Sequence, residues 1–256
     1  MKIAIVGSGN MGGAIARGLS KGSMVAASDI TVTNPSLPKL TALQTEFPSI
    51  DISTDNKAAT EANIIIVAVK PWKVKEVLEE LQLGRHQTLI SVAAGITFDE
   101  LSKLTHPATP LFRAIPNTAI SQQASMTLVS ARNATEEQTQ TVLHMFNEMG
   151  LSILIDESQL AAATALTSCG IAYVLKYVQA AMQAGTELGL RPAESKKMLA
   201  QTLIGAARLL QADEHAHPAT EIDKVTTPGG YTIRGLNQLE HDGFPSAVIR
   251  AIKASL

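Results

Sequence analysis

The feature that most constrains this chain is a glycine-rich stretch that begins at Gly7. An apolar run at residues 3–6 leads directly into Gly7-x-Gly9-x-x-Gly12, and a helical pattern of small and apolar residues follows. A strand, a tight turn and a helix in this order form the diphosphate-binding unit of dinucleotide-binding folds. We expect Gly7 to permit the turn, Gly9 to let the backbone approach a pyrophosphate, and Gly12 to let the helix pack against the strand. The free N–H groups at the helix start then attract the anion.

Downstream of this unit, strand patterns alternate with helix patterns as far as residue 156. Apolar, β-branched runs predict strands at residues 30–34, 63–69, 88–92, 111–115, 126–129 and 151–155. Helices are expected at residues 37–47, 74–83 and 136–149, and a short one begins with Thr97 as its cap and Glu100 as the partner in a capping box. The alternation predicts an α/β fold with a doubly wound, mostly parallel sheet, and we assign residues 1–156 to this Rossmann-type domain.

No further strand pattern follows, and we assign residues 157–256 to an all-helical domain. Its expected helices cover residues 158–188, 192–210, 228 or 230 to 240, and 246–254. The apolar and small positions of the first helix are spread too widely for a helix with one solvent-facing side. It is rich in Ala, Thr, Ser and Gly, which falls short of a membrane-spanning pattern, so we interpret it as a buried helix. A domain of about a hundred residues supplies little burial, and we therefore expect pairing with a second chain.

Composition and charge exclude several classes of partner. The formal net charge is −2, so neither nucleic acid nor an anionic membrane is the expected partner. The single cysteine, Cys169, cannot form an internal disulfide, which fits a reducing compartment, and we interpret it as a small buried hydrophobe. The histidines are scattered without metal-ligand spacing, so no metal is expected. The opening strand leaves no signal-peptide pattern.

The end of the second expected strand bears on the choice of dinucleotide. Sites for NAD usually place Asp or Glu there, whereas Asn34 and Ser36 are neutral. The missing carboxylate removes repulsion against a 2′-phosphate and favours NADPH. No arginine follows, and Lys39 is as readily a solvated helix residue, so NADH stays open as the cofactor.

A second glycine motif lies near the other end of the chain. We expect Thr227 to cap a helix whose first turn contains Pro228, Gly229 and Gly230 and which Gly243 ends. Two glycines in a first turn cost about 1 kcal/mol each relative to alanine, so their presence needs a reason. Exposed N–H groups at a helix start bind carboxylate as well as phosphate, which predicts a small anionic substrate. A flexible helix entry without a ligand is the alternative.

Together these motifs resemble the pyrroline-5-carboxylate reductase family, over the whole chain. The stretches that carry the resemblance are residues 7–12, 68–71, 91–95, 116–118, 170–173, 187–190 and 225–230. The resemblance implies NAD(P)H-dependent reduction of the cyclic imine 1-pyrroline-5-carboxylate to L-proline, the last step of proline biosynthesis. It also implies a cytoplasmic homodimer paired through the helical domain, with larger rings of dimers occurring in the family.

The resemblance further implies roles for individual residues. The implied cofactor-binding set is Gly7, Gly9, Asn10, Met11, Gly12, Asn34, Ser36, Asn56, Val69, Lys70, Pro71, Ala93, Ala94 and Asn117. The glycine loop would hold the pyrophosphate, Asn34 and Ser36 the adenosine end, Asn56 the adenine ribose, and the remainder the nicotinamide. Thr227, Gly229 and Gly230 would take the substrate carboxylate. Thr232 would reach the ring nitrogen and is the catalytic candidate, although a hydroxyl is too weak an acid to be asserted as the sole proton donor.

The sequence departs from the family pattern close to the expected pocket. Residues 168–171 read Ser-Cys-Gly-Ile where the family commonly has Gly-Ser-Gly-Pro, Ile115 and Ala119 flank residues 116–118 in place of Met and Pro, and Tyr231 replaces a small residue. Two other functions therefore stay open. One is a related reductase of another small carboxylated imine or keto acid, and the other is a dinucleotide-binding regulator without turnover.

Overall fold

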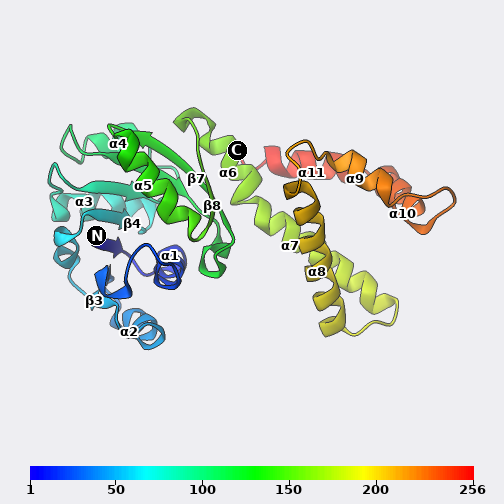
Figure 1. Cartoon of the computed structure of the whole chain (residues 1–256), viewed down its shortest axis with the longest axis horizontal. Helices are drawn as coiled ribbons and strands as arrows, with labels where there is room; N and C mark the ends of the chain where they lie inside the picture. Colours follow the sequence, from blue (N-terminus) through cyan, green and yellow to red (C-terminus); the bar gives the residue numbers. More distant parts are fainter. The chain divides into compact units, whose positions relative to one another are not determined.

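The computed structural model describes the whole chain, residues 1–256. It divides the chain into two compact units, Met1–Ser168 and Cys169–Leu256, which are described separately. In Figure 1 the first unit runs from blue to green and the second from yellow-green to red. The domain boundary that we expect after residue 156 lies just beyond the last strand and before the division at residue 168. It stays a prediction.

One eight-stranded sheet organises the first unit, in the order β3-β2-β1-β4-β5-β6-β7-β8. Its strands are β1 (Ile3–Val6), β2 (Ile30–Thr33), β3 (Asp51–Ser53), β4 (Ile64–Val67), β5 (Thr88–Ser91), β6 (Leu111–Ile115), β7 (Ser125–Arg132) and β8 (Gly150–Leu154). Every neighbouring pair is parallel except β6 with β7. The expected doubly wound, mostly parallel sheet is thus confirmed.

The strand order reverses at β1, which lies between β2 and β4. Val6 at the end of β1 is in register with Thr33 of β2 and with Val67 of β4, so the carboxyl ends of all three strands lie at one edge. In open α/β sheets ligands bind outside the carboxyl ends of the strands, at the point where the order reverses. The start of the chain therefore positions the site.

Both faces of the sheet are covered, which explains the uninterrupted apolar runs of its central strands. Along β1 the side chains alternate, so that Ile3 and Ile5 belong to one buried cluster while Ala4 and Val6 belong to another. The first cluster includes residues of α1 (Asn10–Lys21), α2 (Leu37–Glu46) and α5 (Glu136–Asn147). The second includes residues of α3 (Val74–Leu81) and α4 (Phe98–Ser102). The expected capping box of α4 is present, formed by Thr97 and Glu100.

Several short elements were not expected from the sequence, among them one strand and one helix. β3 has three residues, none of them fully buried, and therefore no apolar run that would predict a strand. It forms at the sheet edge because β2 offers it a parallel partner. The helix α9 (Pro218–Lys224) is seven residues long, with His217 as its cap, and is too short and polar for a periodic pattern.

The long apolar segment after β8 is helical as expected, but it is not buried within the chain. It contains a short 3₁₀ turn (Glu157–Gln159), α6 (Leu160–Thr167) and α7 (Gly170–Glu187). By length and composition alone, residues 157–187 form a helix that could cross a membrane, and an 18-residue window within it has a mean hydropathy of 1.3. Only 11% of this window is buried within the single chain, which agrees with the expectation that a second chain covers the segment, and Cys169 is half-buried. A single chain has too few residues here to cover the segment.

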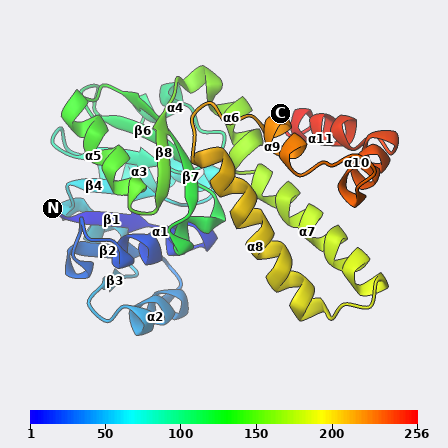
Figure 2. The same cartoon turned by 45° about the vertical axis from the view of Figure 1, so that its right-hand side comes forward.

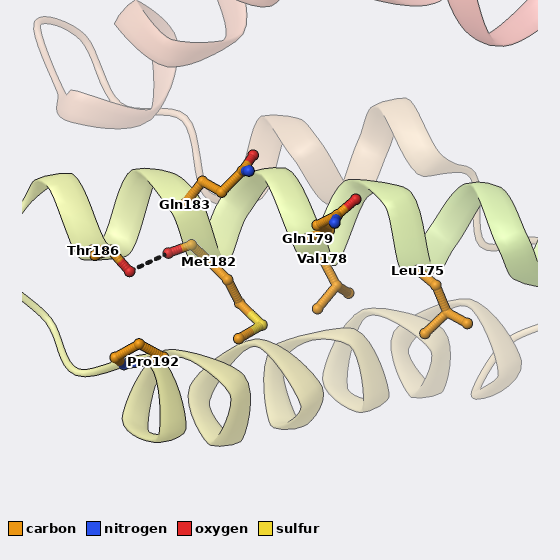
Figure 3. Close-up of a pocket in the computed structure, with 7 residues that line it drawn as sticks. All are labelled: Leu175, Val178, Gln179, Met182, Gln183, Thr186 and Pro192. Atoms are coloured by element: carbon orange, nitrogen blue, oxygen red, sulfur yellow. Dashed lines mark hydrogen bonds between the residues drawn. The ribbon is translucent and has the colours of Figure 1, made fainter.

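The second unit is all-helical. Besides α7 and α9 it contains α8 (Pro192–Gln211), α10 (Tyr231–His241) and α11 (Phe244–Lys253). α7 and α8 lie side by side in Figures 1 and 2, and Gly185 lets Ser195 approach so closely that a Cβ there would lie 2.7 Å from its Oγ. In Figure 3 the side chains of Leu175, Val178 and Met182 extend from α7 toward α8 and line an open groove of about 350 Å³.

Candidate functional site

The glycine loop joins β1 to α1 at the point where the strand order reverses. Gly7 has a φ of +102°, a conformation that favours glycine, and its N–H donates to the Thr33 carbonyl at 2.7 Å. A Cβ on Gly12 would lie 1.8 Å from the Gly7 carbonyl oxygen and 3.0 Å from Ala68 Cβ. The helix can therefore start against the two central strands only because residue 12 has no side chain.

The start of α1 fits a phosphate group on two observations. Gly9 is the residue before the helix, and a Cβ placed on it would have no atom within 4 Å, so open space adjoins the free N–H groups. The hydroxyl of Ser8 is buried and has no hydrogen-bond partner within the chain. A buried hydroxyl without a partner costs free energy, which a phosphate oxygen would recover.

A cavity of about 650 Å³ adjoins this helix start. Its lining includes Gly9, Asn10, Arg17 and Lys39, together with residues of the turn 118–122. Arg17 lies one turn beyond Gly13 on α1, and both of its hydrogen bonds to Glu46 measure 2.7 Å. That hydrogen bonding raises the pKa of the Arg17 guanidinium and lowers the pKa of Glu46. Arg17 was not among the expected residues, although its helical spacing from the glycine loop places it on the same side.

The residues expected at the adenosine end are tied to the glycine loop. Asn34 Oδ1 accepts a hydrogen bond from the Ser8 N–H at 3.2 Å, and Asn34 Nδ2 donates to the Ser36 carbonyl at 3.3 Å. Asn56 Oδ1 accepts from the Thr33 hydroxyl at 2.9 Å. The structure thus places all three near the carboxyl ends of β1 and β2, without Asp or Glu at residues 34 to 36.

The residues expected beside the nicotinamide follow the ends of three neighbouring strands. Val69, Lys70 and Pro71 follow β4, and a Cβ on Gly7 would lie 3.0 Å from Val69 Cγ1. Ala93 and Ala94 follow β5, the first buried and the second exposed. Asn117 follows β6, is buried, and accepts a hydrogen bond from the Ala119 N–H, which holds the turn after it.

The second glycine motif folds differently from the expectation. Thr227 does not cap α10, because the helix begins at Tyr231 with Gly230 as the preceding cap residue. Residues 227–230 form a tight turn in which the Gly230 N–H donates to the Thr227 carbonyl at 3.0 Å. Pro228 and Gly229, whose φ is +71°, occupy the two central positions, a combination typical of a type II turn. The glycines therefore shape the entry to the helix and lie outside its first turn.

The turn keeps the expected substrate residues together in the second unit. Thr227, Gly229 and Gly230 precede the helix start, and Thr232 lies in its first turn. Arg234 was not expected here, yet its guanidinium lies 3.4 Å from the Gly229 carbonyl and adds a positive charge beside the turn. Arg234 lies one turn into the helix that follows the two glycines, and this spacing could have indicated it as a residue of the site.

Replacing Gly230 by valine is expected to weaken binding of a carboxylated substrate, because a Cβ there would lie 2.6 Å from Thr227 Oγ1 and distort the turn. We expect the KM for the substrate to rise about tenfold or more, with the Kd for NADPH within twofold of wild type. The matched control is Gly235→Ala on the same helix, where a Cβ would meet no atom within 4 Å. An unchanged KM in Gly230→Val would place the anion site elsewhere.

The fold and the first site define a Rossmann-type dinucleotide-binding protein. A family model described as pyrroline-5-carboxylate reductase dimerisation matches residues 157–256, and one described as NADP oxidoreductase, coenzyme F420-dependent, matches residues 2–95. Pyrroline-5-carboxylate reductase 2 of Dictyostelium discoideum is 38% identical over 99% of this chain and 90% of its own length. The Escherichia coli K12 pyrroline-5-carboxylate reductase is 34% identical over 98% and 94%. The chain belongs to the pyrroline-5-carboxylate reductase family.

Solved structures agree with this assignment. The Plasmodium falciparum pyrroline carboxylate reductase with NADP bound superposes with a TM-score of 0.89 at 25% identity, covering 100% of this chain and 95% of the other. The Coxiella burnetii pyrroline-5-carboxylate reductase gives 0.88 at 29% identity, covering 99% and 95%. Against pyrroline-5-carboxylate reductase 1 of D. discoideum, at 36% identity, the chain spans only 48% of the relative's length. The resemblance drawn from the sequence is thus confirmed.

Proposed function

We propose that this chain reduces 1-pyrroline-5-carboxylate to L-proline with NADPH, as an oxidoreductase acting on a CH–NH group. The observation that carries the proposal is the phosphate cradle at the start of α1, where open space beside Gly9 meets the buried, unpartnered Ser8 hydroxyl, in a member of this family. The absence of a carboxylate at residues 34 to 36 favours NADPH over NADH, and the P. falciparum relative carries NADP.

The chemistry needs binding and orientation more than a strong acid. When bound, NADPH supplies the hydride that the imine carbon receives, and the ring nitrogen takes up a proton. The α1 start would hold the pyrophosphate, Asn34, Ser36 and Asn56 the adenosine end, and the residues after β4, β5 and β6 the nicotinamide. Thr227, Gly229 and Gly230 would hold the substrate carboxylate. The Thr232 hydroxyl, or a water that it positions, would contact the ring nitrogen.

The test is the rate of NADPH oxidation with racemic pyrroline-5-carboxylate. Turnover with this substrate supports the proposal. Turnover only with other small carboxylated imines or keto acids would instead assign a related reductase, a result that the exposed Tyr231 beside the turn would help to explain. Binding of NADPH without turnover on any of them would assign a regulatory protein.

Replacing Thr232 by alanine is expected to lower kcat by on the order of tenfold to a hundredfold, because the group that contacts the ring nitrogen is lost. The Kd for NADPH should stay within twofold of wild type, measured by equilibrium titration. Thr232→Ser keeps a hydroxyl and should restore most of kcat. Equal losses of kcat and of NADPH affinity in Thr232→Ala would show a structural role instead.

We also propose that two copies pair through the helical unit and form a cytoplasmic homodimer. This pairing leaves room for larger rings that are built from such dimers. Apolar side chains are exposed on every long helix of the unit, among them Leu175 (61%), Met198 (50%) and Ile249 (58%). The family model over residues 157–256 is a dimerisation model. A second copy would cover α7, whose apolar surface one chain leaves exposed. The molar mass from light scattering tests the pairing, and a monomer at micromolar concentration would contradict it.

A further inference from the structure

Asn56 is held from two sides by residues of different elements. Its Oδ1 accepts from the hydroxyl of Thr33, the fully buried last residue of β2, at 2.9 Å. Its Nδ2 donates to Glu80 Oε2 on α3, also at 2.9 Å. Because the Thr33 carbonyl accepts from the Gly7 N–H, the same threonine ties Asn56 to the glycine loop.

These two bonds determine which way the amide of Asn56 faces. A carboxylate oxygen only accepts hydrogen bonds, so Glu80 requires the NH₂ group of Asn56 on its side. The oxygen is then left for the Thr33 hydroxyl. An amide NH₂ carries two donors, and Glu80 uses one, so one N–H remains without a protein partner.

We infer that Glu80 is a positioning residue for the adenosine end of the cofactor. It orients Asn56 so that the remaining N–H donates to an acceptor oxygen on the adenosine ribose. This inference rests on the proposed function, because it takes the loop 7–12 as the dinucleotide site and Asn56 as a ribose contact. Glu80 itself contacts neither substrate nor reacting atoms and acts only through Asn56.

Whether NADPH affinity rises or falls when Glu80 is removed distinguishes the positioning role from a simple charge effect. A carboxylate near a phosphate-bearing ligand repels it, so removal of Glu80 for electrostatic reasons alone would strengthen NADPH binding. Loss of the positioning hydrogen bond acts in the opposite direction and weakens binding. A decrease in affinity therefore reports the orientation of Asn56.

Glu80→Ala is expected to raise the Kd for NADPH about threefold to tenfold, the range of one partly exposed hydrogen bond. Glu80→Gln retains an acceptor oxygen and should stay within twofold of wild type. The matched control is Glu79→Ala, which removes a neighbouring carboxylate from the same helix, one that pairs with Lys75. The Kd is read from the emission of Trp72, the single tryptophan of the chain, during titration with NADPH.

A double-mutant cycle tests whether the effect passes through Asn56. In the Asn56→Ala background, Glu80→Ala should change the Kd by less than twofold, because no amide remains to be oriented. The same pattern is expected for adenosine 2′,5′-bisphosphate, which carries the adenosine end alone. The melting temperature without cofactor and kcat at saturating NADPH should stay at their wild-type values in Glu80→Ala.

Three results would overturn the inference. The first is an unchanged Kd for NADPH in Glu80→Ala, and the second is an equal loss of NADPH affinity in Glu79→Ala. The third is that Glu80→Ala raises the Kd by the same factor in the Asn56→Ala background as in the wild type. Wild-type protein that binds NADPH but does not reduce pyrroline-5-carboxylate would overturn the proposed reaction while the cycle still decides the role of Glu80. Wild-type protein that binds no NADPH would overturn both.

Discussion

Replacing Gly12 by alanine is expected to destabilise the first unit strongly. The added Cβ would lie 1.8 Å from the Gly7 carbonyl oxygen and 3.0 Å from Ala68 Cβ, so α1 has to move away from the central strands. Overpacking of this kind costs about 3 kcal/mol at the upper end of the usual range. That cost corresponds to a fall in melting temperature of about 6–12 °C for a chain of this size. Thermal unfolding at fixed protein concentration measures it.

The neighbouring glycine supplies the control. A Cβ on Gly13 would come within 3.3 Å of Arg17 Nη1, the mobile end of a long side chain. Gly13→Ala should therefore keep the wild-type melting temperature, or raise it slightly because alanine favours the helix by about 1 kcal/mol. A Gly12→Ala variant as stable as Gly13→Ala would show that the helix start tolerates a side chain at residue 12.

Replacing Gly9 by alanine should weaken cofactor binding strongly and leave the fold intact. The new methyl group would meet no atom of the chain within 4 Å, because it occupies the open space beside the free N–H groups of α1. The pyrophosphate needs that space, and we expect the Kd for NADPH to rise by on the order of a hundredfold. Alanine is a poorer cap residue than glycine, so the free energy of unfolding should fall by at most about 1 kcal/mol. The fall in melting temperature should be correspondingly small.

This variant separates the site from the scaffold, because equilibrium titration with NADPH and thermal unfolding are measured on the same protein. Gly13→Ala again serves as the control for stability, and Gly235→Ala, on a helix of the second unit, serves as the control for NADPH binding. Wild-type affinity in Gly9→Ala would contradict a pyrophosphate at the start of α1. A large loss of stability would mean that Gly9 has a structural part that the contacts of the chain do not indicate.

Most of the sheet could be predicted from the sequence because its strands are local patterns. The β-branched runs of β1 and β4 are buried on both faces, and such runs are visible without knowledge of their neighbours. β3 could not be predicted, since its three residues form a strand only by pairing with β2. The segment α6–α7 was predicted as a helix that a second chain covers, because its apolar positions are spread around the helix, and its exposure in the single chain agrees with that.

The candidate site shows the same division. Glycine spacing alone indicated that Gly7 would turn the chain and that Gly12 would contact the strand, and both are observed. The expected cap at Thr227 was wrong, because a proline followed by glycine can enter either a helix or a type II turn. Arg17 was not predicted as a site residue, because its position beside the cavity depends on how α1 packs against the sheet.

The sequence by itself determined the βαβ alternation, the glycine cradle, the neutral residues at the end of β2 and the helical second half, since each depends on residues close together in the chain. Only the tertiary structure decided that Asn56 lies between Thr33 and Glu80. Thr33 ends β2, Asn56 begins a 3₁₀ helix (Asn56–Glu61) and Glu80 lies on α3, and the packing of this short helix against β2 and α3 brings the three residues together. Local composition contains no information on such contacts, because they arise from the packing of elements that are distant in sequence.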